Sequence, residues 1–581
     1  MNKNIVYILL CLLLASCNES EFLKERPEDF MSSDNSYITE ADFNMAVNGL
    51  YYSVRKEFYG ADENTPFDYI YGTDLLYDGE PGTSNRHGNM TAAYNPTGNI
   101  PKAHWDYLYK LIADAYAIIC RVGATSFPEE TRTLFTAKAR FFRGLAYRTL
   151  AYLYGGVPIT LEEVSAPKTD FVRATKEETL AQALDDVKYA AEHLPDIAAV
   201  KDGEVSSAAA CHLLAELYLA TGDNREAVDA ASRVIGNPAL ALMKERFGSR
   251  ATETPGDVYW DLFRMNNQNR GAGNTEGVWV IQFETNLPGG GSSTADLKLD
   301  GNYMLERHCA PMVRDVKLRT EQNGVIKDYS PFLWPVGDYT GGRGIGWGIT
   351  TEHYSHTIWQ SDFDNDIRNA NHNFVRRFAV NNPSFREQFG IDTIDVDNPP
   401  ANLIVGQDGS TTIPGRFLYA YPSKCTTPYN HPAELYANAA TYELKSIAGT
   451  TYTDQYMFRL AETYLLRAEA YLNLGEKELA AADINAVRER AHARPVEAEQ
   501  VDLDYILDER MRELGVEEKR RLTLMRLGKL YDRVIKCNPY YADPATNGDG
   551  MGMLEKYNLW PIPQSAIEAN TDAVLEQNPG Y

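Results

Sequence analysis

Cysteine is scarce in this sequence, with seven among 581 residues. Apart from Cys11 and Cys17 near the N-terminus, the other five are far apart, and no two form a CxxC pair. An odd number of cysteines without ligand spacing argues against both a disulfide framework and a zinc site. Cys120 and Cys211 lie in apolar helical patterns, so we expect them to be small core residues.

Positive charge is also in short supply. Lysine and arginine number 56 against 81 aspartates and glutamates, which gives a formal net charge of −25 and a pI near 4.9. A surface with this balance repels polyanions, so nucleic acid is not an expected partner. His353 and His356 lack an HExxH pattern, which argues against a metalloprotease, and the glycines at 289–291 lack the lysine of a phosphate-binding loop.

A regular calcium loop is missing as well. Asp362, Asp364 and Asp366 have the spacing with which such a loop begins, but Ile367 occupies the sixth position and Asn373 the twelfth. We expect these aspartates to cap helices and form salt bridges. We therefore predict no metal and no cofactor, with an irregular calcium site as the alternative.

The apolar run near the N-terminus is too short to cross a bilayer. It covers ten residues, 5–14, whereas a membrane-spanning helix needs about 20. Lys3 precedes the run and Leu-Ala-Ser-Cys17 ends it, a pattern that resembles a bacterial lipoprotein signal. We expect a signal peptide at 1–16, a lipid on the Cys17 sulfur and a polar tether at 17–36. An ordinary signal peptide with a chance cysteine is the alternative.

Helical periodicity is what the sequence has in abundance. In residues 456–491, apolar side chains recur every three or four positions on both sides of Gly475, which predicts two antiparallel helices joined by a left-handed turn. The segment AELYLATGD at 215–223 matches AEAYLNLGE at 468–476, so this tetratricopeptide-type hairpin occurs at least twice. The positions that define the 456–491 pattern are Met457, Leu460, Tyr464, Ala468, Tyr471, Ala480, Ile484, Val487 and Ala491.

Further helices are predicted in the N-terminal part, 37–237. Phe43, Val47 and Leu50 share one helical face, and Thr175 with Glu178 forms a capping box. Between these helices, residues 59–101 lose periodicity and are rich in Gly, Pro, Asn, Asp and Tyr. Irregular segments of this length in compact proteins are usually functional or disordered, and the aromatic content favours an ordered loop.

The centre of the chain, 238–451, has a different character. Turn residues, five of the seven tryptophans and short β-like runs such as VWVIQF at 278–283 replace the helical pattern, which returns at 452–581. Neither helical end has enough repeats to close its own core. The prediction is a mainly α fold, with a tetratricopeptide-like scaffold built from both ends and a large loop-rich insertion containing short β-strands.

Several segments together resemble the SusD/RagB family of outer-membrane glycan-binding lipoproteins. They are the lipoprotein-like signal, FRGLAYRTLAYLYGGVPI at 142–159, the hairpin at 456–491, Glu509-Arg510 with Arg512-Glu513, Arg521, Arg526, LWPIP at 559–563 and QNPGY at 577–581. Leu522 departs from the family pattern, where an aromatic residue commonly follows the arginine; this affects the expected local packing.

The resemblance implies a role for the protein. Such proteins are anchored by lipid to the outer membrane, face the cell exterior, and capture oligosaccharides or polysaccharides for a SusC-like TonB-dependent transporter. They make and break no bond, so the resemblance implies a protein that is not an enzyme.

Carbohydrate binding needs flat aromatic side chains for the C–H faces of a sugar and polar side chains for its hydroxyl groups. Both irregular regions offer these types. We predict Trp334, Tyr339 and Trp347 as stacking platforms. Tyr77, Asp78 and Arg86 are the predicted assisting residues. For each tryptophan the competing interpretation is packing inside the insertion, because large aromatic residues are mostly buried.

Two other functions remain open at this stage. A surface glycoside hydrolase would release reducing sugar, and with 81 acidic residues some carboxylate pair will have glycosidase spacing by chance. A tetratricopeptide adaptor would bind protein and have no affinity for glycans. Neither the identity of the glycan nor the transporter-contacting face can be predicted from one sequence.

Overall fold

The computed structural model describes residues 37–60, 64–80, 88–162, 167–287, 290–292, 303–338, 342–406, 409–450, 452–542 and 552–581. Helices make up most of the scaffold, and no helix among these residues is long and apolar enough to traverse a bilayer. The helices are α3 (Glu40–Arg55), α4 (Met90–Ala93), α5 (Asn99–Gly123), α6 (Glu129–Tyr154), α7 (Lys176–His193), α8 (Ser207–Thr221), α9 (Asn224–Ile235), α10 (Val258–Leu262), α11 (Leu305–Cys309), α12 (Glu352–Ser355), α13 (Pro383–Phe389), α14 (Leu460–Asn473), α15 (Lys477–Arg490), α16 (Leu503–Glu513), α17 (Arg520–Arg526), α18 (Leu530–Cys537), α19 (Pro539–Ala542) and α21 (Gln564–Ala569).

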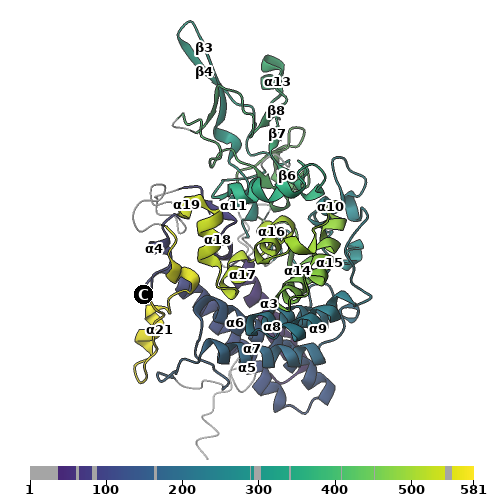
Figure 1. Ribbon diagram of the computed structural model, residues 1–581, viewed down its shortest axis with the longest axis vertical. Coiled ribbons are helices and arrows are strands. Elements are labelled where there is room, and N and C mark those ends of the chain that lie inside the picture. Colours follow the sequence, from purple (N-terminus) through teal and green to yellow (C-terminus); the bar gives the residue numbers. More distant parts are fainter. Residues whose placement is uncertain are drawn as a thin grey trace, which may run out of the picture.

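The scaffold is a series of helical hairpins drawn from both ends of the chain. Helices α5 to α9 pack each against the next, α9 packs against α14, and α14 packs against α15 and α16. Figure 1 shows the blue N-terminal helices at the base and the green helices α14–α16 directly above them. The predicted mainly α, tetratricopeptide-like fold is confirmed.

Local signals in the sequence place the helix ends. Gly222 ends α8 with φ 84°, and Gly475 separates α14 from α15 with φ 78°, a left-handed conformation that glycine adopts without steric cost. At the start of α7, Thr175 accepts a hydrogen bond from the Glu178 N–H at 3.1 Å, and the Glu178 carboxylate accepts one from the Thr175 N–H at 2.8 Å. The predicted capping box is therefore present.

Two local predictions were wrong. Residues Gln455–Arg459 form a strand, β13, and the helix begins only at Leu460. Tyr-Met-Phe fits either period, and pairing with strand β2 (Gly277–Ile281) decides the outcome. Cys120 is exposed on α5, whereas Cys211 is buried as expected. The apolar face of α5 that enters the core carries Ile118 and Val122 instead.

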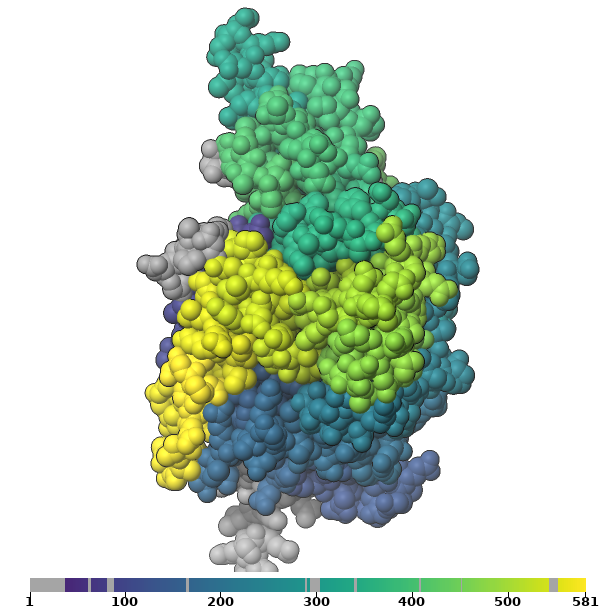
Figure 2. Space-filling view, viewed as in Figure 1, coloured from purple at the N-terminus to yellow at the C-terminus, as the bar shows by residue number. Residues whose placement is uncertain are grey.

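The strands are short and form small antiparallel sheets. They are β1 (Leu76–Asp78), β2, β3 (Val316–Gln322), β4 (Val325–Tyr329), β5 (Gly348–Thr350), β6 (Phe374–Val375), β7 (Arg377–Ala379), β8 (Thr393–Asp395), β9 (Leu403–Val405), β10 (Tyr421–Pro422), β11 (Tyr436–Asn438), β12 (Glu443–Leu444) and β13. The sheet with order β4-β3-β9 and the pair β7-β8 project from the top of the molecule, and Figure 2 shows them as a crest above the scaffold. The predicted boundaries of the insertion, 238 and 451, stay a prediction.

The C-terminal segment closes against the N-terminal helices. Trp560 is fully buried, and its backbone N–H donates to the Leu153 carbonyl on α6 at 2.6 Å. The Asn578 amide donates to the carbonyls of Trp560 and Tyr154 at 2.7 and 2.9 Å. The two C-terminal motifs, at 559–563 and 577–581, thus fix the end of the chain to α6.

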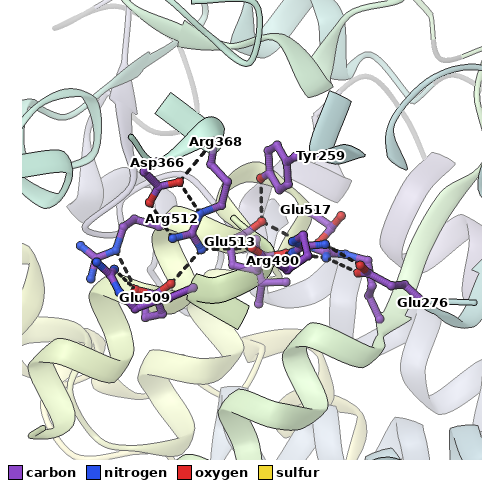
Figure 3. Close-up of polar contacts among 12 residues, drawn as sticks. Tyr259, Glu276, Asp366, Arg368, Arg490, Glu509, Arg512, Glu513 and Glu517 are labelled. Atoms are coloured by element: carbon purple, nitrogen blue, oxygen red, sulfur yellow. Dashed lines mark hydrogen bonds and ion pairs between the residues drawn. The ribbon is translucent and has the colours of Figure 1, made fainter. Parts of the chain in front are cut away.

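A buried charge network joins the insertion to the C-terminal helices (Figure 3). The Glu513 carboxylate on α16 accepts hydrogen bonds from Arg459 at 2.5 Å and Arg368 at 3.1 Å, and it also pairs with Arg490. Burial raises the pKa of Glu513, but the three guanidinium groups outweigh it and hold the pKa well below the ordinary value. Glu513 is therefore a buried anion with three cationic partners.

The neighbouring carboxylate, Glu509, repeats this arrangement one helical turn earlier. It accepts from Arg368 at 2.8 Å, from Arg488 at 2.9 Å and from Arg512 at 2.8 Å. Arg368 belongs to the insertion and also pairs with Asp366 at 2.7 Å. Because Arg368 bridges Glu509 and Glu513, the charged motif on α16 holds the insertion against the scaffold.

Two partly accessible carboxylates make stability depend on acidic pH. Burial raises the pKa of Glu462, but Arg510 and a histidine lower it further, so that it lies at about 2 against an ordinary 4.5. Asp508, bonded to His353 and Arg533, has its pKa at about 2 against 3.8, again in spite of burial. Between the folded-state pKa of about 2 and the ordinary pKa of 4.5 for Glu462 or 3.8 for Asp508, each carboxylate binds a proton in the unfolded chain but not in the folded chain.

The free energy of unfolding is therefore expected to fall as the pH is lowered from about 4.5 towards 2, and to be unaffected by these two groups above that window. Urea unfolding followed by circular dichroism at a series of pH values measures this dependence. A Glu462→Gln, Asp508→Asn double variant should show a shallower slope. A wild-type stability that stayed constant or rose through this window would contradict the assignment.

Candidate functional site

Strands β1 and β5 bring two of the predicted regions together. Tyr77 pairs with Ile349 and Asp78 with Gly348, and the Gly79 N–H donates to the Trp347 carbonyl at 2.8 Å, which extends the ladder. Residues two apart on a strand share a face with each other and with the residue opposite. Tyr77 and Trp347 therefore lie on the same face of this ribbon, and both are half-buried.

Tyr77 has an aromatic partner that the sequence did not suggest. Its ring stacks on Tyr540 of α19, with centroids 4.9 Å apart and an interplanar angle of 18°. Burial raises the pKa of the Tyr77 hydroxyl, which keeps it a neutral donor and acceptor. The adjacent Tyr541 hydroxyl accepts a hydrogen bond from the Asp78 N–H at 3.1 Å. Helix α19 thus supports β1 from outside the two predicted regions.

Polar groups border this aromatic pair. The Asp78 carboxylate is nearly buried and accepts from the Glu80 N–H at 2.7 Å. Glu80 pairs with Arg416, whose Nε donates to the Ile345 carbonyl at 2.9 Å. Burial lowers the pKa of Arg416, and the Asp78 charge opposes that shift. A carboxylate and a guanidinium therefore lie at the end of the ribbon next to Trp347.

The close approach of the two loops requires glycine. A Cβ on Gly79 would lie 2.1 Å from the Gly346 carbonyl oxygen, and Gly346 itself has φ 67°. The Gly346 N–H donates to the Ala310 carbonyl at 2.9 Å, which ties this loop to the residue after α11. The edge of the Trp347 ring contacts His308 of α11, with centroids 4.9 Å apart at 62°. These contacts fix where Trp347 stands.

The structure places Trp334 in a cationic surrounding. The guanidinium carbons of Arg343 and Arg314 lie 4.3 and 5.0 Å from its ring centroid, and the side chain is half-buried. Burial, and then the neighbouring Arg307, lower the pKa of Arg343 to about 10, while Glu306 opposes the shift. Cation–π contacts of this kind stabilise an indole in position. A sugar at Trp334 would have to share the ring with these arginines.

Three of the predicted residues lie outside the described residues: Arg86, Tyr339 and the lipidation residue Cys17. Two other aromatic residues of the Trp334–Trp359 region, Tyr354 and Trp359, are fully buried. The Trp359 indole N–H donates to the Tyr354 carbonyl at 2.8 Å, so this end of the region is core.

Two of the three aspartates that resemble a calcium loop, Asp362 and Asp366, form hydrogen bonds with the protein itself. Asp366 caps the N–H of Arg368 at 3.1 Å and pairs with its guanidinium, and Asp362 accepts from the Arg494 N–H at 2.7 Å. In the parts of the chain that the structure describes, no group of three or more His, Cys, Asp or Glu side chains could hold a metal ion.

The arrangement is chemically suited to noncovalent recognition of a polar, ring-shaped ligand. Half-buried rings from two loops stand beside a carboxylate and a guanidinium whose charges are already paired. Tyr540 and Arg416 were missed by sequence analysis. The Tyr-Tyr pair at 540–541 is the one signal that could have pointed to the former, because adjacent tyrosines after a helix resemble the predicted platforms.

Two family models match this chain. The model described as the SusD family matches residues 275–581, more than half of the chain, and one described as "Starch-binding associating with outer membrane" matches residues 21–219. The chain belongs to the SusD family. Together the two matches cover most scaffold helices of both ends and most of the insertion, and they leave residues 220–274, which include α9, between them.

Relatives of this SusD-family protein span its whole length. SusD-like protein P25 of Formosa agariphila is 25% identical, with 99% of each chain covered. The starch-binding protein SusD of Bacteroides thetaiotaomicron is 36% identical over 140 residues, 24% of each chain. Among solved structures, a laminarin-binding SusD-like protein has a TM-score of 0.65 at 22% identity, covering 94% of this chain and 100% of its own.

A further solved structure is similar in fold. Surface glycan-binding protein A from Bacteroides thetaiotaomicron in complex with laminarihexaose has a TM-score of 0.65 at 18% identity, covering 93% of this chain and 99% of its own. At this identity the likeness shows a shared fold.

Proposed function

We propose that this SusD-family protein captures oligosaccharides or polysaccharides at the bacterial surface and passes them, unaltered, to a SusC-like TonB-dependent transporter. In this proposal a lipid on Cys17 anchors the chain to the outer membrane with the insertion facing the exterior. Family membership supports the role, and the names of relatives that bind starch and laminarin support the ligand class.

One structural observation carries the choice of site. Tyr77 and Trp347, from loops about 270 positions apart in the sequence, share a face of the β1–β5 ribbon beside Asp78, Glu80 and Arg416. Stacked or flat aromatic rings bind the C–H face of a pyranose, and neighbouring carboxylate, guanidinium and hydroxyl groups exchange hydrogen bonds with its rim. Trp334, Tyr339 and Arg86 are proposed as additional glycan-contacting residues.

A polysaccharide screen tests the function. The purified chain from residue 18 onward, which lacks the lipid-bearing cysteine, is run through gels containing laminarin, starch, xylan or galactomannan, and reducing sugar is assayed in parallel. We expect retardation on at least one polysaccharide and no release of reducing sugar. Release that a single carboxylate substitution abolishes would instead assign a hydrolase, and free migration on every polysaccharide would refute glycan capture.

A further inference from the structure

An open pocket of about 930 Å³ lies at a different place in the insertion. It is formed by the loop that precedes and follows α10 and by the segment around β11 and β12, and it shares no lining residue with the Tyr77–Trp347 surface. Its lining includes Arg250, Glu253, Trp260, Asn266, Tyr429 and Tyr442. We call it the Tyr429–Tyr442 pocket.

Two half-buried tyrosine rings form one wall. The rings of Tyr429 and Tyr442 meet edge to face, with centroids 4.8 Å apart at 72°. The Tyr429 N–H donates to the Gly337 carbonyl at 3.2 Å, and the Gly337 N–H donates to the Tyr442 carbonyl at 2.6 Å. The backbone at both tyrosines is therefore held by hydrogen bonds to one residue, which keeps the two residues side by side in the absence of a ligand.

The backbone at this pocket is strained. Asn266, Tyr429 and Tyr442 have φ angles of 68°, 58° and 57°, so three of the seven left-handed non-glycine residues in the described part of the chain line this one pocket. Asparagine tolerates this conformation, but tyrosine does so at a cost in free energy. Strained backbone of this kind clusters at functional sites, where it holds a side chain in a required position. In this pocket, two of the three strained residues carry an aromatic ring.

The charges that line the pocket are paired within the protein. Arg250 Nε donates to the Glu253 carboxylate at 2.5 Å, and the same guanidinium donates to the Pro428 carbonyl. Because the Arg250 and Glu253 charges compensate each other, the pocket has no unpaired charge among them to attract a charged ligand, and a neutral ligand fits better. The amides of Asn266 and Asn430 offer both donors and acceptors to such a ligand.

Trp260 adds a donor that the described residues leave unsatisfied. The residue is 1% exposed, and its indole N–H has no hydrogen-bond partner in the described part of the chain. The Arg264 guanidinium covers the ring at 3.8 Å from its centroid, which fixes the indole in place. A buried N–H without an acceptor is destabilising, and this cost falls on a residue that lines the pocket.

We propose that the Tyr429–Tyr442 pocket is a second carbohydrate-binding site, which takes a neutral sugar residue against its tyrosine rings. The ligand class rests on the proposed function; the location and the preference for a neutral ring rest on the pocket itself. With two separate sites, one protein holds a polysaccharide chain at two points, or holds two chains. Binding of long chains then exceeds what either site gives alone.

The test uses substitutions that remove the rings and suit the backbone. Tyr429→Asn with Tyr442→Asn places a residue that tolerates the left-handed conformation at both positions. Tyr37→Asn is the matched control, because Tyr37 is also half-buried and left-handed, at φ 65°. Tyr37 packs on Phe43, and both residues are far from the pocket residues in sequence. Tyr429→Phe with Tyr442→Phe keeps both rings, and binding close to wild type is expected from it.

Binding is measured as dissociation constants by affinity electrophoresis in laminarin, starch, xylan and galactomannan, with melting temperatures taken in parallel. The asparagine pair should bind the retained polysaccharide roughly tenfold more weakly, while melting at or above the wild-type temperature and while the Tyr37 control binds as wild type. Wild-type affinity in the asparagine pair overturns this inference and leaves the proposed function standing. If no polysaccharide retains the wild-type protein, both this inference and the proposed function are overturned. If the phenylalanine pair loses as much binding as the asparagine pair, the rings do not bind sugar by stacking.

Discussion

Replacing Glu513 by glutamine is expected to lower the free energy of unfolding by about 3–5 kcal/mol, the range observed when one partner of a buried ion pair is removed. The carboxylate has three arginine partners, Arg368, Arg459 and Arg490, and all four side chains are nearly or fully buried. A neutral amide cannot compensate these charges, and burial separates them from bulk solvent. Guanidinium chloride unfolding gives the free energy directly.

Glu489→Gln is the control for that experiment. Glu489 lies on α15 and pairs with Lys244 at 3.4 Å, but both side chains are mostly exposed, so the same chemical change should cost no more than about 1 kcal/mol. If the free energy of unfolding fell by the same small amount in both variants, Glu513 would not hold the insertion to the scaffold. A loss confined to Glu513→Gln, with a binding surface that still functions at low temperature, would support the arrangement.

Helical periodicity predicted the scaffold because amphipathic helices report their buried face directly in sequence. Leu460, Ala468 and Ile484 are buried as the spacing indicates, and Gly475 turns the chain as expected. The same reasoning failed at Met457, since a five-residue segment with a large side chain at every position fits either the helical or the strand period until its partner strand is known.

The charged core was not predictable from composition. Glu509, Arg512 and Glu513 have the appearance of a solvated helix face, and only their partners from the insertion make burial possible. The resemblance to the SusD/RagB family marked these residues as a motif without giving the reason. Their role depends on contacts between segments that are distant in sequence, which one sequence does not specify.

The binding surface was predictable by region and less so by residue. Tyr77 and Trp347 belong to the two aromatic-rich loops, and the pairing of β1 with β5 brings them to one face. Tyr540, which stacks on Tyr77, comes from a helix more than 400 positions away, and no local pattern connects the two. Stacking between side chains of different loops depends on the conformations of those loops. Irregular loops have no sequence periodicity from which their conformations could be predicted.

Alanine at both Tyr77 and Trp347 is expected to weaken retention on the bound polysaccharide about a hundredfold. Each ring contributes roughly a factor of ten through stacking and burial against a sugar face, which is about 1.4 kcal/mol per ring. Both are half-buried on a two-stranded ribbon held by glycine contacts, so removing them should leave the ribbon in place. Affinity electrophoresis with the polysaccharide found in the screen measures the loss.

Tyr189→Ala is the control for this prediction, because Tyr189 is a half-buried tyrosine on α7 that stacks on His193 in the scaffold. If its retention equals that of wild type while the double variant is retained much more weakly, the loss is specific to the β1–β5 surface. A double variant that keeps wild-type affinity and melts normally would remove Tyr77 and Trp347 from the binding site. The Tyr429–Tyr442 pocket shares no residue with this surface, so the double variant should keep some binding through the pocket. If that residual binding disappears when Tyr429→Asn and Tyr442→Asn are added, two sites hold the same polysaccharide.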